Sequence, residues 1–81
     1  MTKHPYFVTD YQDRQVIRRI IDKYGMDQMD AIRAFITSWT HDMLENADLG
    51  LADLPSAAIF DMWEAEKITG DPRNSAYIRG D

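Results

Sequence analysis

Apolar residues recur at three- and four-residue spacings in three parts of the chain, and this pattern predicts three helices. The first helix is expected over about residues 10–24, between a capping box that opens with Thr9 and a stop at Gly25. Its apolar face is formed by Val16, Ile17, Ile20, Ile21 and Tyr24. Asp13 projects onto the same face, so it is the one residue that does not fit the pattern.

The second helix has the strongest periodic signal in the chain. It is expected over about residues 28–47, with Asp27 as its N-cap and an end before Gly50. Its continuous apolar stripe consists of Ile32, Phe35, Ile36, Trp39, Met43 and Ala47. At 1.5 Å per residue, such a helix would be about 30 Å long.

The third helix is expected over about residues 54–69, with Pro55 in its first turn and Gly70 as its stop. Phe60 and Ile68 lie roughly opposite its main apolar face, and a helix that is apolar on two sides is either sandwiched or binds a partner. The main apolar face is formed by Ala58, Ile59, Met62, Trp63 and Ala65. Glu66 projects beside this face, which indicates a carboxylate at the rim of the core.

These elements predict a mainly α fold, a small three-helix domain with short extended N- and C-terminal segments. The chain of 81 residues has room for one domain, residues 1–81. We expect the first two helices to form an antiparallel hairpin, with the third packed across it. The extended segments, at about 6–9 and 76–79, should pair with each other or cover Phe60 and Ile68.

Composition excludes several classes of protein. There is no cysteine, which excludes disulfide scaffolds, thiolate nucleophiles and the common zinc fingers. No uncharged apolar run approaches the ~18 residues of a membrane span, and the apolar stretch at 6–8 is too short for a signal peptide. We therefore expect a cytoplasmic protein.

The net charge of -5 is unevenly distributed. Residues 1–26 contain five basic and three acidic residues, a net charge of +2. Residues 27–66 contain nine acidic residues and only Arg33, a net charge of -8, and residues 67–81 carry +1. The excess negative charge therefore belongs to the second and third helices, either as a solvated face or as a surface for a basic partner.

The second interpretation predicts a partner-binding surface on these two helices. Acidic side chains along a rigid helix can approach a surface lined with Lys and Arg, and Phe60 would supply an apolar anchor. The residues expected to contact the partner are Asp30, His41, Glu45, Asp48, Phe60, Asp61 and Glu64.

Candidate chemistry is sparse. His41 and Glu45 are four residues apart, so they share a helix face and could bind a metal or relay a proton. Two ligands do not make a metal site, and the only other histidine is His4, so we expect an exposed helix pair. No glycine-rich phosphate loop or nucleophile motif is present. We expect no cofactor, no metal and no enzymatic activity.

Residues 6–36 resemble ribbon-helix-helix proteins of the antitoxin and repressor type. A short apolar segment at Tyr6–Val8 precedes an amphipathic helix, and Gly25, the capping residue Asp27 and the pair Ile32–Arg33 follow it. The resemblance implies an obligate dimer that places paired N-terminal strands in the DNA major groove. The segment before the helix departs from the family pattern, because Pro5 and aromatic residues stand where polar or basic residues should read the bases.

Three functional hypotheses follow. The favoured one is a non-enzymatic binding protein that blocks the basic surface of a larger, nucleic-acid-handling protein. Small phage-encoded inhibitors such as anti-CRISPR and anti-restriction proteins are similar in size, acidity and lack of cysteine. The alternative is a ribbon-helix-helix regulator or antitoxin that binds DNA as a dimer through residues 1–10, and a third is a scaffolding subunit.

Overall fold

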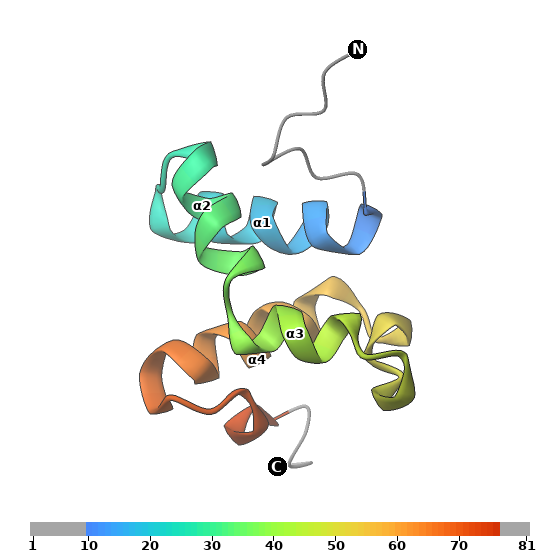
Figure 1. Ribbon diagram of the computed structural model, residues 1–81. Helices are drawn as coiled ribbons and strands as arrows, with labels where there is room; N and C mark the ends of the chain where they lie inside the picture. The colour runs from blue at the N-terminus through green and yellow to red at the C-terminus, as the bar shows by residue number, and fades with distance from the viewer. Residues whose placement is uncertain (1–9, 77–81) are drawn as a thin grey trace.

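The computed structural model describes residues 10–76, and this part of the chain folds into helices joined by short turns (Figure 1). The four α-helices are α1 (Tyr11–Tyr24), α2 (Gln28–Ile36), α3 (Trp39–Glu45) and α4 (Ser56–Thr69). Three short 3-10 helices are η1 (Ala47–Leu49), η2 (Leu51–Asp53) and η3 (Pro72–Asn74). The prediction of a small, mainly α domain is confirmed. The extended segments expected at about residues 6–9 and 76–79 lie outside the described residues, except for Ala76.

Helix α1 begins one residue later than its predicted capping box. Its N-cap is Asp10 rather than Thr9, and the Asp10 carboxylate accepts a hydrogen bond from the Asp13 backbone N–H at 3.1 Å. The helix ends as predicted at Gly25, which adopts a left-handed conformation with φ of 64° and donates its N–H to the Ile21 carbonyl. Asp favours the start of a helix because its side chain accepts a hydrogen bond from a free backbone N–H. Gly favours the end because it adopts a positive φ without steric strain.

The single helix predicted over residues 28–47 is wrong, because the chain breaks it at Thr37 and Ser38 into α2 and α3. Ser38 is extended, with φ of -84° and ψ of 159°, and its hydroxyl accepts from the His41 N–H at 3.1 Å. The same hydroxyl donates to the Phe35 carbonyl at 2.6 Å, and the Thr37 hydroxyl donates to the Arg33 carbonyl at 2.7 Å. Ser and Thr can satisfy backbone groups in this way, so a helix can stop and restart at these two residues.

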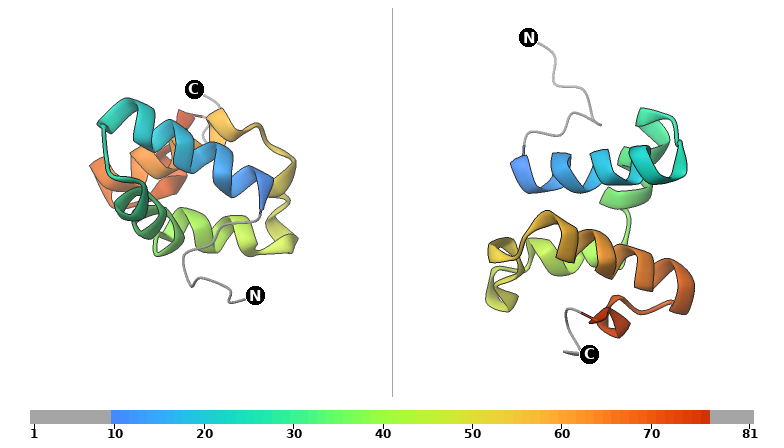
Figure 2. Two further views of the ribbon diagram at one scale, coloured as in Figure 1. Left: turned by 90° about the horizontal axis from the view of Figure 1, so that it is seen from above. Right: turned by 180° about the vertical axis from the view of Figure 1, so that it is seen from behind.

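The helices form two groups, with α1 and α2 on one side and α3 and α4 on the other (Figures 1 and 2). Helix α2 packs against α1 but runs across its end rather than alongside it, so the expected antiparallel hairpin is not formed (Figure 1). Helix α4 packs against both α1 and α3 and thereby holds the two groups together. The side chains buried between them include Val16, Ile20, Phe35, Ile59 and Met62.

The two-sided apolar character of α4 is partly explained by this packing. Ile59, Met62 and Trp63 are buried in the core, and Phe60 is half-buried and stacks on Trp63. Ile68 is 82% exposed. The main apolar face of α4 is therefore buried and Phe60 is partly covered, whereas Ile68 faces solvent.

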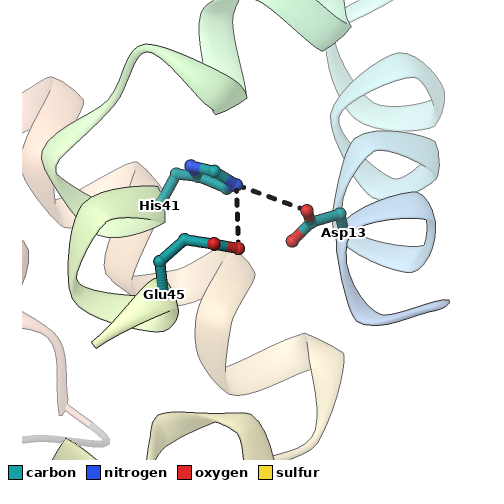
Figure 3. Close-up of side chains that lie close together, drawn as sticks. All are labelled: Asp13, His41 and Glu45. Atoms are coloured by element: carbon teal, nitrogen blue, oxygen red, sulfur yellow. Dashed lines mark hydrogen bonds and ion pairs between the residues drawn. The ribbon is translucent and has the colours of Figure 1, made fainter. Parts of the chain in front are cut away.

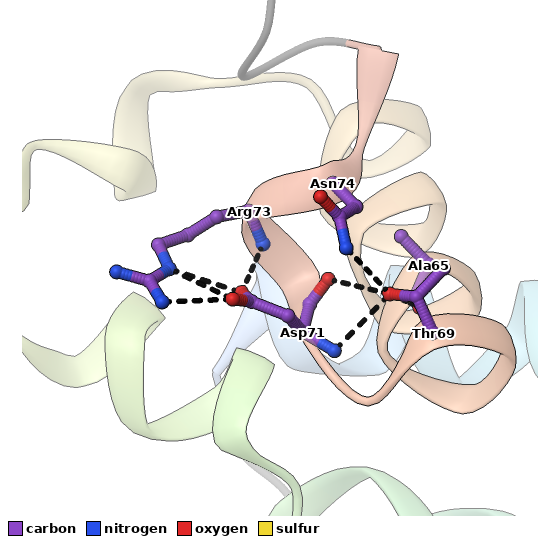
Figure 4. A network of polar contacts seen from close by, with 5 residues as sticks. All are labelled: Ala65, Thr69, Asp71, Arg73 and Asn74. Carbon is purple, nitrogen blue, oxygen red and sulfur yellow. Dashed lines mark hydrogen bonds and ion pairs between the residues drawn. The ribbon is translucent and has the colours of Figure 1, made fainter.

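A polar network holds η3 against the end of α4 (Figure 4). The Thr69 hydroxyl donates to the Ala65 carbonyl and accepts from the Asp71 N–H and from the Asn74 amide. The Asp71 carboxylate accepts from the Arg73 backbone N–H and forms a bidentate pair with its guanidinium. These contacts close the turn at residues 69–74 and hold η3 in place.

Candidate functional site

The seven predicted partner-binding residues lie on α2, α3, η1 and α4 and differ in exposure. Asp30, Glu45 and Asp48 are exposed, but Asp30 lies on α2 and the other two lie beyond the break at Ser38. The remaining four residues, His41, Phe60, Asp61 and Glu64, are half-buried.

Asp61 and Glu64 are engaged in contacts within the fold. Asp61 accepts a hydrogen bond from the Ser75 hydroxyl at 2.5 Å, which fastens the chain after η3 to α4. Glu64 accepts from the Lys23 ammonium and the Tyr24 hydroxyl, each at 2.5 Å, which fastens the end of α1 to α4. Burial raises the pKa of Glu64, but the hydrogen bonds from Lys23 and Tyr24 outweigh it and leave the pKa below its ordinary value.

Phe60 belongs to the same contact region. The Lys23 ammonium lies 5.8 Å from the centre of the Phe60 ring, and Tyr24 meets Trp63 edge-to-face at 5.9 Å. Phe60 therefore helps to join α1 to α4 and presents only part of its ring to solvent.

Four exposed carboxylates lie on the consecutive elements α3, η1 and η2, and we call these four residues the acidic surface: Asp42, Glu45, Asp48 and Asp53. Sequence positions 34–66 contain no Lys or Arg, and within this stretch His41 approaches Glu45, with 3.6 Å between Nε2 and Oε2. The side chain of Asn46 caps η1 by accepting from the Asp48 N–H at 3.1 Å, which fixes the turn after α3. The acidic surface is therefore carried by three short elements, of which α3 and η1 have side-chain caps from Ser38 and Asn46.

An open hollow adjoins the acidic surface. Its lining combines apolar and polar side chains from α3, η1 and η3: Trp39, Asp42, Met43, Asn46, Leu49 and Arg73. Trp39 and Leu49 are large apolar residues that remain 41% and 47% exposed. The Arg73 guanidinium lies 5.2 Å from the centre of the Trp39 ring and is paired with Asp71, so its charge is already partnered.

A second acidic feature lies between α1 and α3, where Asp13, His41 and Glu45 meet (Figure 3). Nε2 of His41 is 3.3 Å from Oδ2 of Asp13 and 3.6 Å from Oε2 of Glu45. The His41 ring also packs edge-to-face against Phe35 at 5.2 Å. The expectation that His41 and Glu45 form an exposed helix pair is therefore wrong for His41, whose side chain is only 16% exposed.

The electrostatics of this cluster favour positive charge at its centre. The hydrogen bond to Asp13 raises the pKa of His41 above its ordinary value, and the nearby charges of Asp13, Glu45 and Asp42 act in the same direction against burial. Asp13 is only 6% exposed, and its Oδ1 atom is buried without a hydrogen-bond partner among the described residues. A buried carboxylate oxygen left in this state is costly.

Sequence analysis missed the roles of Asp13 and Glu66. In the sequence, Asp13 stands out only as a polar residue on the apolar face of its helix. In the structure this position is buried, and its carboxylate contacts His41 of α3. Glu66 was expected at the rim of the core, but its carboxylate in fact accepts from the backbone N–H groups of Trp39 and Thr40 and from the Thr40 hydroxyl. Glu66 thus caps the N-terminus of α3 from α4.

Comparison with known proteins finds no matching family model, no similar curated protein and no similar solved structure. Within residues 10–76, none of the helices combines the length and the apolar character needed to cross a bilayer. The resemblance of residues 6–36 to ribbon-helix-helix proteins depends on a strand at Tyr6–Val8, and this segment lies outside the described residues.

Proposed function

We propose that this protein is a non-enzymatic binding protein that covers a basic, nucleic-acid-handling surface of a larger protein through its acidic surface. The observation that carries the proposal is the presence of four exposed carboxylates on consecutive short elements, in a stretch of chain without Lys or Arg. Carboxylates in this arrangement can meet Lys and Arg side chains that otherwise contact phosphates.

The neighbouring hollow supplies the apolar part of such an interface. Stable interfaces usually have a few aromatic or large apolar anchors surrounded by polar contacts. Trp39 and Leu49 are exposed at the hollow, whereas Phe60, the anchor expected from the sequence, is half-buried against Trp63. Trp39 and Leu49 therefore take the role first assigned to Phe60.

In the proposed complex, the charge of the acidic surface raises the association rate and the selectivity for basic partners more than it raises the affinity. Opposite charges on two proteins accelerate their encounter, and the effect falls as salt screens them. A protein that inhibits by this route competes directly with the nucleic acid of its partner, which is how small phage-encoded inhibitors of the anti-CRISPR or anti-restriction type would use such a surface.

The test compares the wild-type chain with the variant Asp48→Asn/Asp53→Asn, which lowers the charge of the acidic surface and leaves Glu45 intact. A matched control, Asp22→Asn/Asp27→Asn, removes the same charge elsewhere, and Asn at position 27 still caps α2. Each immobilised protein is exposed to an extract of the cells that produce it, and the captured protein is purified. Its affinity for each variant is then measured at low and at physiological salt.

The proposal expects a nucleic-acid-binding partner whose affinity falls about tenfold or more in the Asp48→Asn/Asp53→Asn variant and is little changed in the control. Added nucleic acid should displace the protein, and salt should weaken the complex. Equal affinities for all three proteins, with no effect of salt, would show that the acidic surface is only solvated.

The same preparations test the ribbon-helix-helix alternative. Solution mass and duplex DNA binding at low salt are measured on the full chain. A tight dimer that shifts duplex DNA and loses the shift on Lys3→Ala would replace the proposed function with that of a DNA-binding regulator. A monomer that leaves DNA unshifted removes this alternative.

A further inference from the structure

The cluster of Asp13, His41 and Glu45 combines ligands from two helices at one point. His41 and Glu45 are one turn apart on α3, and Asp13 approaches them from α1, 28 residues earlier than His41 (Figure 3). One nitrogen and two carboxylate oxygens can thereby lie within 4.8 Å of one another. The sequence indicated only two neighbouring ligands, His41 and Glu45, and the fold adds Asp13 as a third.

Hydrogen bonding alone does not satisfy this cluster. The 3.6 Å between Nε2 of His41 and Oε2 of Glu45 exceeds the length of a normal N–H···O hydrogen bond, and the 3.3 Å to Asp13 is at its long end. Oδ1 of Asp13 is buried and has no hydrogen-bond partner within residues 10–76, and in Figure 3 both carboxylate oxygens of Asp13 face the other two side chains. The buried carboxylate of Asp13 therefore offers an acceptor atom, Oδ1, that no described protein group uses.

The distances from Nε2 of His41 to the two carboxylates match those between neighbouring ligands of a small tetrahedral cation. Nitrogen and oxygen ligands lie about 2.0–2.2 Å from Zn²⁺, so two ligands at a tetrahedral angle stand about 3.3–3.6 Å apart. The two measured distances from Nε2 of His41, 3.3 and 3.6 Å, fall at the ends of this range. The same contacts that are long for hydrogen bonds are therefore of the right length for neighbouring ligands of one metal ion.

We propose that Asp13, His41 and Glu45 form a binding site for a divalent transition-metal cation of the Zn²⁺ type. Imidazole together with two carboxylates suits Zn²⁺ and related ions better than Mg²⁺ or Ca²⁺, which prefer sites made of oxygen ligands alone. Three protein ligands leave a fourth position for water or another ligand. Binding requires the neutral imidazole, so the cation replaces a proton on His41.

The cation would connect α1 to α3 and supply the positive charge that the buried Asp13 faces. A ligand that binds only the folded protein stabilises it by mass action, so Zn²⁺ should raise the melting temperature. For a domain of this size we expect a rise of about 5 °C or more at saturating Zn²⁺. The site shares Glu45 with the acidic surface but needs none of Asp42, Asp48 and Asp53, so the two proposals are tested by different variants.

The experiment uses the full chain, free of any histidine tag and stripped of metal with EDTA. Calorimetric titration with ZnCl₂ should give one cation per chain, and thermal unfolding should shift upward on addition of Zn²⁺. Co²⁺ is a second probe, because a tetrahedral site gives it a visible absorption that the aqueous ion lacks at the same strength. Each of the variants Asp13→Asn, His41→Ala and Glu45→Gln should weaken Zn²⁺ binding by about tenfold or more.

Asp48→Asn is the matched control, because it removes one nearby exposed carboxylate without touching the three ligands. Glu45→Gln keeps the test valid if a change at buried Asp13 prevents folding, since the Glu45 side chain is 62% exposed and its loss leaves the core intact. The proposal is overturned if the wild-type chain binds no Zn²⁺. It is equally overturned if Glu45→Gln and His41→Ala bind as tightly as wild type, or if Asp48→Asn weakens binding as much as they do.

Discussion

Replacement of Glu66 tests whether the break between α2 and α3 is stabilised from outside those helices. In the folded protein its Oε2 atom accepts from the Trp39 N–H at 3.0 Å, and its Oε1 atom accepts from the Thr40 N–H at 2.9 Å and from the Thr40 hydroxyl at 2.8 Å. Thr40 is fully buried, so its hydroxyl cannot turn to water when the carboxylate is removed. The carboxylate also lies at the positive end of α3.

These contacts set the size of the effect. Hydrogen bonds to a charged acceptor contribute about 1.5–3 kcal/mol each, and the loss of a helix cap costs about 0.5–2 kcal/mol. Because the Trp39 N–H is exposed and can bond to water, we expect Glu66→Ala to lower the free energy of unfolding by about 3 kcal/mol. Glu66→Gln retains one carbonyl acceptor and should lose about half as much. A domain of 81 residues has only about 4–12 kcal/mol in total, so either loss is readily measured.

The assay is urea unfolding followed by circular dichroism in buffer with EDTA. With a slope of about 1–1.5 kcal/mol/M, Glu66→Ala should lower the midpoint by about 2 M or more. Glu45→Ala is the control, since it removes an exposed glutamate from α3 itself and should change the stability by less than about 0.5 kcal/mol. If both variants unfold at the same urea concentration, the capping of α3 by Glu66 does not stabilise the fold.

Three further predictions use the same unfolding assay. Phe35→Ala, at a fully buried position, should cost about 3–5 kcal/mol, and a loss below 1 kcal/mol would place Phe35 outside the core. Gly25→Ala should cost about 1 kcal/mol, because the residue has φ of 64°, and a neutral result would mean that the turn after α1 relaxes at no cost. Glu64→Gln should be less stable than wild type at pH 7 by about 0.5–1 kcal/mol, since the Lys23 side chain is exposed and solvent screens the pair. Folding lowers the pKa of Glu64, so the stability difference should be complete above pH 4.5, the pKa of glutamate in the unfolded chain. It should shrink as the pH falls through the lower pKa of the folded protein. A stability difference that grows in acid would contradict the ion pair between Glu64 and Lys23.

The local features of the fold are those that the sequence predicts best. The apolar spacing in α1 and α4 and the stops at Gly25 and Gly70 indicate helices close to the observed ones, because helical periodicity and capping depend on residues within about four positions. The division of charge is likewise a property of the sequence, and it places the acidic surface in a stretch of chain without Lys or Arg.

The sequence did not predict the break at Ser38, although it contains the two residues that stabilise the break, Ser38 and Glu66. Ser38 can cap a helix, but the apolar stripe continues through Ile36, Trp39 and Met43 and favours one uninterrupted helix. The additional acceptor for the N–H groups at the start of α3 is Glu66, 26 residues after Thr40. Periodicity within one helix contains no information on such a distant partner.

The exposure and the contacts of the acidic residues also depend on tertiary packing. As sequence positions, Asp61, Glu64 and Glu45 are equivalent carboxylates on predicted helices, but packing directs Glu64 to Lys23 and Tyr24 and leaves Glu45 exposed beside His41. Asp13 was the single residue whose mismatch with its own helix indicated a tertiary role. Sequence alone therefore determined α1, α4 and the distribution of charge. Tertiary packing decided the break between α2 and α3, and it also decided which carboxylates are exposed, which stabilise the fold and which meet at His41. The physical reason is that helix formation and capping act over one turn, while burial and ion pairing join groups that are tens of residues apart.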